Sequence, residues 1–314
     1  MKKYFFAVYA LALAALLVPL CGCSLATQNF FSDSDAYTAG NTAISDPVES
    51  LDIAWLAGEV RVERGDGPDI LLSETSDVTL TEKMQLHWWL DGRTLRVKFA
   101  SAGAREETEN RVEKQLTVTL PRELSLNRFE VHIYSAGLTG DVGAADEVNI
   151  RATSGSTDIT CKTPELRVNS MSGAVVADNS EEAPHTIDIR TTSGRVELSC
   201  RRVSGTAYVK TTSGSIAVSA DAAEEMTLES DSGRVSCHFA SAGANNGTFR
   251  TTSGSILLSL PADFGFTLHP SAGSGSLNGT DFGFSDGSDT YVYGDGAATL
   301  SVKTGSGSIT LQQN

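Results

Sequence analysis

Aromatic, basic and cysteine residues are all scarce in this sequence. Aromatic residues make up 7% of its 314 positions, so platforms of stacked rings for sugar binding are not expected to be abundant. Lysine and arginine total 24 against 39 aspartate and glutamate residues, which gives a formal net charge of −15. An acidic surface predicts solubility near anionic lipid and argues against a nucleic acid as partner.

The five cysteines form no pattern that predicts disulfides. Cys161 and Cys200 lie two units apart in the repeat array described below, which places them roughly 9 to 10 Å from each other. A disulfide needs Cα atoms closer than about 7 Å. Cys237, two units beyond Cys200, is no better placed. We therefore expect buried free thiols that pack as small hydrophobic side chains.

The N-terminus has the features of a secretory signal. Two lysines precede the apolar run at residues 4–20, which is short for a bilayer span and contains a proline. The tetrad Leu20-Cys21-Gly22-Cys23 resembles the lipobox of bacterial lipoproteins, in which a peptidase cuts before the cysteine and its thiol carries a diacylglyceryl group. The resemblance implies a lipoprotein signal peptide at residues 1–22 and lipidation of Cys23. An ordinary cleaved signal is the alternative.

Two further segments precede the repeats. Residues 23–48 are mostly small and polar, which predicts a flexible tether that holds the folded part off the membrane. Residues 49–128 contain alternating apolar and polar segments with turn signals between them, and no linker separates them from the repeats. We expect these residues to form an N-terminal cap with the first irregular β coils. Within this part, Ala104 to Lys114 is expected to be a solvated loop or one short helix.

The dipeptide Ser-Gly recurs through the second half of the chain at a nearly constant spacing. Successive glycines lie 18, 21, 20, 19, 21, 21 and 32 residues apart. A period near twenty indicates a stack of units that cannot bury their apolar faces alone. The glycines concerned are Gly155, Gly173, Gly194, Gly214, Gly233, Gly254, Gly275 and Gly307.

Apolar and polar residues alternate on both sides of each glycine. Five positions before it stand apolar residues such as Ile189, Val209 and Leu228, and four positions before it the residues are polar. Three positions before it the residues are all small, as a narrow interior corner requires. This pattern predicts a short strand, a corner and another short strand, with glycine supplying positive φ at the corner. We predict a parallel β-helix over residues 129–314 with coils of about 20 residues; a β-sandwich of Ser-Gly hairpins is the alternative.

Several segments resemble a known family. They are Leu116-Thr-Val-Thr-Leu-Pro121, Phe129-Glu-Val-His-Ile-Tyr-Ser-Ala-Gly137 and the strand-Thr-Ser-Gly units at residues 148–155 and 187–194. They are similar to the bacterial putative-adhesin family catalogued as domain of unknown function 4097 (DUF4097). The resemblance extends from about Ser50 to the C-terminus. It implies a β-helical envelope protein, often membrane-anchored. The family has no catalytic residues that could be assigned to positions of this sequence.

Many β-helices cleave polysaccharides with clustered carboxylates, so an enzyme has to be considered. Three positions after the glycines, the acids Asp158 and Glu197 never fall on adjacent coils. Residues 283–287 match the Gly-x-Ser-x-Gly nucleophile elbow but lack a following helix. The five histidines show no metal-ligand spacing, and the aspartates at residues 281–295 fit no known calcium loop. We predict no enzyme activity, no cofactor and no metal, with a polysaccharide-active enzyme as the less favoured alternative.

Basic residues recur at the position four before the glycine, on what the alternation predicts to be an outward face. Asn169, Glu229 and Ser271 interrupt this basic column. Residues along such a ladder lie roughly 5 to 10 Å apart, close to the Debye length, so they can present a continuous positive potential to an anionic cell-wall polymer. Pairing with neighbours such as Asp188 is the alternative. The basic column consists of Arg151, Arg190, Lys210, Arg250 and Lys303.

Two classes of function fit these expectations. One is an adhesin or binding scaffold that meets an anionic cell-wall polymer or an envelope protein along its length. The other is a regulatory or structural envelope lipoprotein that acts with a membrane partner, as in envelope-stress sensing. Both place the protein on the extracytoplasmic face of a bacterial cell membrane, held there by its N-terminal lipid.

Replacing Cys23 with serine tests the predicted anchor. Because the thiol is the acceptor of the lipid, Cys23→Ser is expected to release the protein from membranes or to stall it as the precursor. Intact-mass analysis of the wild-type protein should show a diacylglyceryl group on an N-terminal Cys23. A mature N-terminus at any other residue would contradict the assignment.

Overall fold

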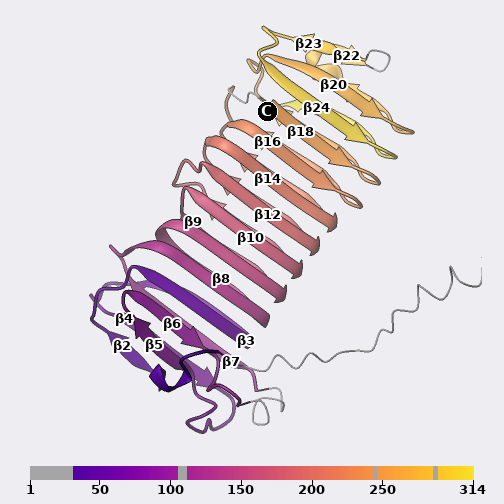
Figure 1. Cartoon of the computed structure of the whole chain (residues 1–314). Helices are drawn as coiled ribbons and strands as arrows, with labels where there is room; N and C mark the ends of the chain where they lie inside the picture. Colours follow the sequence, from indigo (N-terminus) through magenta and orange to yellow (C-terminus); the bar gives the residue numbers. More distant parts are fainter. Residues whose placement is uncertain (1–30, 105–111, 243–245, 286–288) are drawn as a thin grey trace, which may run out of the picture.

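The computed structural model describes residues 31–104, 112–242, 246–285 and 289–314. Figure 1 shows them as one elongated stack of strands, with β2 to β7 (within residues 42–121) at one end and β20, β22 and β23 (within residues 266–293) at the other. The predicted signal peptide and Cys23 lie outside the described residues. Within these residues, no helix is long and apolar enough to span a membrane.

Each repeat forms one coil of two strands joined at the Ser-Gly corner. In one coil, β12 (Thr186–Ser193) leads to the corner and β13 (Val196–Cys200) leaves it. The strand β12 pairs in parallel with β10 (Glu165–Ser172) and β14 (Val203–Ser213). The strand β13 pairs in parallel with β11 (Val175–Asn179) and β15 (Ile216–Ala220). The parallel β-helix is confirmed, and a sandwich built from hairpins is excluded.

The register between coils is the one that the glycine spacing predicts. Ile189 pairs with Val209, which pairs with Leu228, and all three side chains are fully buried. Their neighbours Arg190 and Lys210 also pair with each other and point outward. Residues at the same position of successive repeats therefore line up in one column, which lies either on the surface or in the core.

The stack has two long sides. On one side run β8 (Ser125–Ser154), β10, β12, β14, β16 (Ala223–Ser230), β18 (Asn246–Thr251), β24 (Ala298–Thr304) and β20 (Phe266–Ala272). On the other run β9 (Thr157–Lys162), β11, β13, β15, β17 (Val235–Phe239), β19 (Ile256–Leu260), β25 (Ile309–Gln313) and β21 (Leu277–Gly279). The buried apolar side chains between the two sides form one continuous core.

The last coils do not stack in chain order, contrary to the expectation from the sequence. The strand β24 pairs with β18 on one edge and with β20 on the other. Likewise β25 pairs with both β19 and β21. The C-terminal coil is therefore inserted between two coils that precede it in the sequence (Figure 1).

The N-terminal end has the same arrangement. The strand β3 (Ser50–Gly65) pairs with β8 on one edge. On its other edge it pairs with β6 (Thr94–Lys98) and β7 (Lys114–Pro121), which follow it in the chain. At both ends of the stack, the first or last coil of the chain is thus the second layer, and a different coil forms the outermost layer.

Antiparallel strands cover both outermost coils. At the N-terminal end, β4 (Ile70–Ser76) pairs with β7, and β5 (His87–Asp91) pairs with β6. The short strands β2 (Thr42–Ile44) and β1 (Thr38–Ala39), which follow a 3-10 turn at Ser34–Ala36, continue these sheets. The prediction of a flexible tether over residues 23–48 is therefore wrong for its second half, which is part of the cap. At the C-terminal end, β23 (Tyr291–Tyr293) pairs with β20, and β22 (Phe284–Ser285), which follows a 3-10 turn at Thr280–Phe282, pairs with β21. Covering these edges removes the open ladders on which another chain can add.

The corner glycines are required for a different reason from the one predicted. Of the glycines in the series, Gly155 and Gly173 have positive φ, whereas Gly194, Gly214 and the later ones do not. A Cβ atom added at Gly214 would lie 2.0 Å from the carbonyl oxygen of Gly194 in the neighbouring coil. The same contact with the adjacent coil recurs along the corner. Close approach of the backbones, rather than a left-handed conformation, therefore excludes side chains here.

A ladder of hydroxyl groups reinforces the same corner. The small residues three positions before the glycine are buried, as predicted, except for the half-buried Ala272, and several of them are threonine or serine. The Ser230 hydroxyl donates to the carbonyl of Gly214 at 2.9 Å, and the Thr304 hydroxyl donates to that of Gly254 at 2.7 Å. Thr211 and Thr251 make the equivalent bonds. Each bond joins two coils and satisfies a buried polar group.

The three described cysteines are buried and free, as predicted. Burial raises the pKa of the Cys161 and Cys200 thiols to about 12. Burial also raises the pKa of Cys237, whose sulfur lies 3.5 Å from that of Met226. Thiols held in the protonated form in an apolar interior are unreactive, so these cysteines contribute packing.

Alanine at a corner glycine tests the close-approach explanation. Because the new Cβ would overlap the Gly194 carbonyl, we expect Gly214→Ala to lower the free energy of unfolding by about 2 kcal/mol or more. The control is Gly67→Ala at an exposed turn, where nothing lies within 4 Å of the added Cβ. This variant should be neutral or stabilising by less than about 1 kcal/mol. Equal losses in denaturant unfolding would show that the corner tolerates a side chain.

Candidate binding face

The structure places the five residues of the basic column on one exposed sheet face. From Arg151 the column passes through Asn169 to Arg190 and Lys210, one coil at a time. It continues through Glu229 to Arg250 and then to Lys303. Over six coil spacings of about 4.8 Å, the column is about 29 Å long.

Insertion of the C-terminal coil changes the end of this column. The sequence predicted that Ser271 separates Arg250 from Lys303, and this prediction is wrong. Lys303 pairs directly with Arg250, and Ser271 lies on the outer side of Lys303. Two cationic residues therefore stand on adjacent coils at the C-terminal end of the column.

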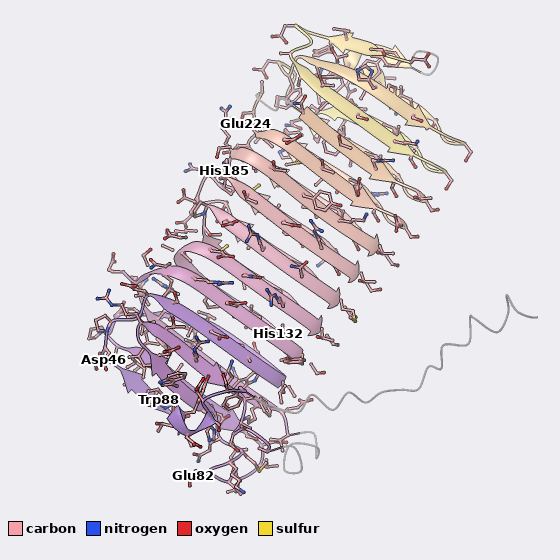
Figure 2. The ribbon with its side chains drawn as sticks, viewed as in Figure 1. Asp46, Glu82, Trp88, His132, His185 and Glu224 are labelled. Carbon is pink, nitrogen blue, oxygen red and sulfur yellow. The ribbon has the colours of Figure 1, made fainter. Side chains whose placement is uncertain are left out.

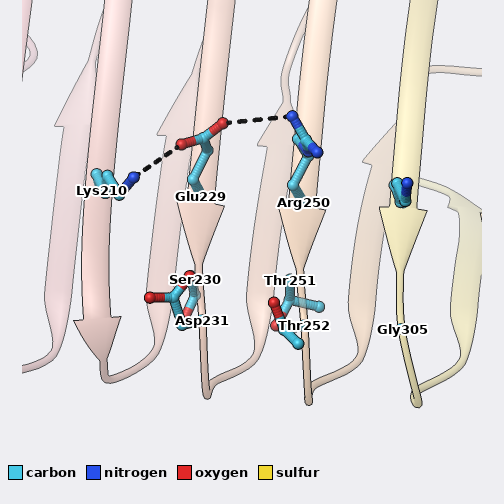
Figure 3. A pocket seen from close by; sticks show the side chains of 9 residues that line it. Lys210, Glu229, Ser230, Asp231, Arg250, Thr251, Thr252 and Gly305 are labelled. Carbon is cyan, nitrogen blue, oxygen red and sulfur yellow. Dashed lines mark ion pairs between the residues drawn. The ribbon is translucent and has the colours of Figure 1, made fainter. Parts of the chain in front are cut away.

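Two grooves follow the column and meet at Lys210, which lines both of them. One has a volume of about 410 Å³ and is lined by His132, Arg151, Asn169, Met171, Arg190, Lys210 and neighbouring residues of the corner. The other has a volume of about 380 Å³ and is lined by Lys210, Glu229, Ser230, Asp231, Arg250, Thr251, Thr252, Lys303 and Gly305. Figure 3 shows this second groove. We refer to the two together as the basic trough.

Acidic neighbours neutralise part of the column. Arg190 binds Asp188 through two nitrogens, at 2.7 and 3.0 Å, and its guanidinium lies 5.0 Å from the centre of the Tyr208 ring. The hydrogen bonds to Asp188 raise the pKa of Arg190 further above its ordinary value. Arg190 is thus held by the protein itself, in agreement with the pairing alternative considered above.

Glu229 lies between Lys210 and Arg250 and contacts both (Figure 3). Its carboxylate is 3.4 Å from the Lys210 ammonium and 4.0 Å from the Arg250 guanidinium, and it also accepts a hydrogen bond from the Tyr208 hydroxyl. Arg151 lies 4.0 Å from Glu130. Within the described part of the chain, Lys303 has no ion pair. Pairing is therefore tightest at Arg190, looser at Lys210, equally loose at Arg151 and Arg250, and absent at Lys303 among the described residues.

His132 lies on the same face towards the N-terminal end of the stack (Figure 2). Its ring stacks on Tyr134 with centroids 4.4 Å apart. Partial burial, and secondarily the positive charge of Arg151, lowers the pKa of His132 below its ordinary value. The imidazole is therefore neutral near pH 7, and it adds polarity rather than charge to the trough.

Catalytic constellations are not found among the residues that the structure describes. No three histidine, cysteine, aspartate or glutamate residues in these ranges cluster as metal ligands. Asp158 and Glu197 are separated by the intervening coil at Val176, as predicted. Gly283 follows a 3-10 turn and precedes strand β22, so the local order is not the strand, turn and helix of a nucleophile elbow.

The sequence analysis did not predict that the charged side chain of Lys114 is buried. Lys114 was expected in a solvated segment, but it begins β7 and is fully buried. Its ammonium lies 2.5 Å from the buried Glu74 carboxylate, donates to the backbone carbonyls of Met84 and Phe99, and lies 5.0 Å from the Trp55 ring. Burial lowers the pKa of Lys114, and Glu74 opposes this shift. These contacts join separate segments of the N-terminal cap, which gives Lys114 a structural role.

The sequence model of the family described as Toastrack DUF4097 matches residues 48–312. No curated protein matches the sequence.

Solved structures are similar at low identity. A putative adhesin from Bacteroides fragilis is 15% identical, with 88% of this chain and 97% of that chain covered and a TM-score of 0.39. A putative lipid binding protein from Parabacteroides distasonis is 13% identical, with the same coverage and a TM-score of 0.41. A putative cell adhesion protein from Clostridium sporogenes is 12% identical, with 88% and 100% covered and a TM-score of 0.27. At these TM-scores the likenesses carry no argument about this chain.

Proposed function

This chain belongs to the Toastrack DUF4097 family, and on that premise we propose that it is a non-catalytic binding scaffold of the bacterial cell envelope. The ligand that we propose is an extended anionic polymer, such as a cell-wall polymer, which lies along the basic trough. The observation that carries this proposal is the continuity of the trough, which follows the basic column through successive coils of an acidic protein.

The geometry of a solenoid suits a polymer better than a small molecule. Each coil adds one outward residue to the column at a spacing of about 4.8 Å, so a linear ligand meets equivalent positions repeatedly. Individual contacts between exposed charges are weak, but several contacts along one ligand add up. The two grooves are open to solvent and are lined mainly by charged, hydroxyl and amide residues, which favours an extended chain over an enclosed apolar ligand.

Attachment to the membrane is the second part of the proposal. A lipid on Cys23 would hold the protein at the extracytoplasmic face of the membrane, and the residues between Cys23 and β1 would connect it to the folded cap. The stack would then project from the membrane with the basic trough running along it. This arrangement rests on the lipobox resemblance of residues 20–23.

Charge removal in the trough tests the polymer proposal. We expect the triple variant Arg190→Ser, Lys210→Ser and Arg250→Ser to weaken attachment of the purified protein to isolated cell-wall material at low salt, because three cationic contacts are lost. The matched control replaces Lys162, Arg195 and Arg201, which lie outside the trough, with serine and changes the net charge equally.

The measurement is the bound fraction in a cosedimentation assay over a range of salt concentrations. The control variant should bind as the wild type does, and the difference between the two variants should shrink as salt increases. If both triple variants lost the same fraction of cell-wall binding, the loss would be due to the change in net charge and not to the position of the residues in the trough. Capture of an envelope protein from membranes by a variant that has lost cell-wall attachment would favour the alternative of a lipoprotein acting with a membrane partner.

A further inference from the structure

We propose that the C-terminal end of the basic trough, between Arg250 and Lys303, is a specific site for one phosphate-class oxyanion. The proposal rests on the proposed function and narrows it. A ligand would be anchored at this one end, and the remainder of the basic column would guide it. A phosphodiester polymer and free phosphate both supply this group, and the site would recognise either one by the same chemistry.

Cations without a close acidic partner occupy only part of the basic column. Arg190 is bound by Asp188 through two hydrogen bonds. Lys210 is attracted by both Glu229 and Asp231, which line the same groove. Arg151 and Arg250 are each 4.0 Å from a carboxylate oxygen, which is beyond hydrogen-bond distance, and Lys303 has no ion pair with any described residue. Of these three weakly paired cations, only Arg250 and Lys303 stand on adjacent coils.

Arg250 and Lys303 are also close enough to bind one anion together. Arg250 and Lys303 are direct partners in neighbouring parallel strands, with Cα atoms about 4.8 Å apart. A guanidinium and an ammonium at this separation can bind different oxygens of one phosphate group. If the coils had stacked in chain order, the Ser271 coil would have doubled the separation to about 10 Å. The inserted C-terminal coil thus creates the pair.

A further hydrogen-bond donor lies beside this pair. Two positions after the column residue, the Arg250 coil carries the exposed Thr252, which lines the same groove and offers its hydroxyl as a donor. The Lys303 coil carries Gly305 at this position, and the next coil outward carries Gly273. A Cβ added at Gly305 would lie 2.6 Å from the Thr252 carbonyl oxygen, so close backbone contact holds the two coils together at this point.

Single charge-neutral variants of the full-length protein test this site. The probes are inorganic phosphate and a soluble polymer of glycerol phosphodiesters, titrated by calorimetry at low salt. Because hydrogen bonds to charged groups are among the stronger ones, we expect Lys303→Gln and Arg250→Gln each to weaken phosphate binding about tenfold or more. Arg190→Gln should have a smaller effect. The control Arg195→Gln, outside the trough, should bind as the wild type does.

The outcomes separate this site from the proposed function. Loss of polymer and phosphate binding in Lys303→Gln, with melting temperatures unchanged, supports the site. Phosphate binding without polymer binding supports the site and counts against the polymer as ligand. If Arg190→Gln weakens polymer binding as much as Lys303→Gln does, the specific site is overturned, but the proposed function as a binding scaffold is not. Absence of phosphate binding in the wild type also overturns the site, whatever the cell-wall attachment assay shows.

Discussion

Close contact between the backbones of adjacent coils at the corner is the constraint on which the rest of the structure depends. The carbonyl of one corner glycine occupies the space that a Cβ of the next would need. Buried hydroxyl groups three positions earlier bind the same carbonyls and fix the coils to one another. Because every coil is held at the same point, equivalent residues align along the whole stack. Core columns and surface columns, including the basic column, follow from this alignment.

Much of this arrangement could be predicted from the sequence, because the relevant information is local. Spacing from the glycine identified the inward column of Ile189 and Val209 and the outward column of Arg190 and Lys210, and the strand register confirms both. The order of the last coils could not be predicted in this way. Val302 and Pro270 fit the same position of the repeat, and only pairing across distant segments decides which of them lies beside Phe249. The burial of Lys114 depends on similarly distant partners, among them Glu74 and Trp55.

Insertion of the terminal coils links the fold to the candidate site. The strands β3 and β24 each lie between two other coils, so neither can leave the stack without breaking the pairing on both of its edges. At the C-terminal end the same topology brings Lys303 next to Arg250 and places Gly305 beside them. Glu229 and Asp188 meanwhile pair with Lys210 and Arg190 further along the column, and Glu229 also lies 4.0 Å from Arg250. The column, which the sequence predicted to be interrupted at Ser271, therefore ends in two cations on adjacent coils.

Mapping an anionic ligand onto the protein by NMR tests the central claim most directly. A ¹⁵N-labelled sample titrated with a short oligomer of phosphodiesters should show its largest amide shifts at residues 250–252 and 303–305. Smaller shifts should extend along the trough toward Arg190. The account would be contradicted if the shifts fell on the opposite side of the stack, in β9 to β25, or if saturating oligomer at low salt produced none.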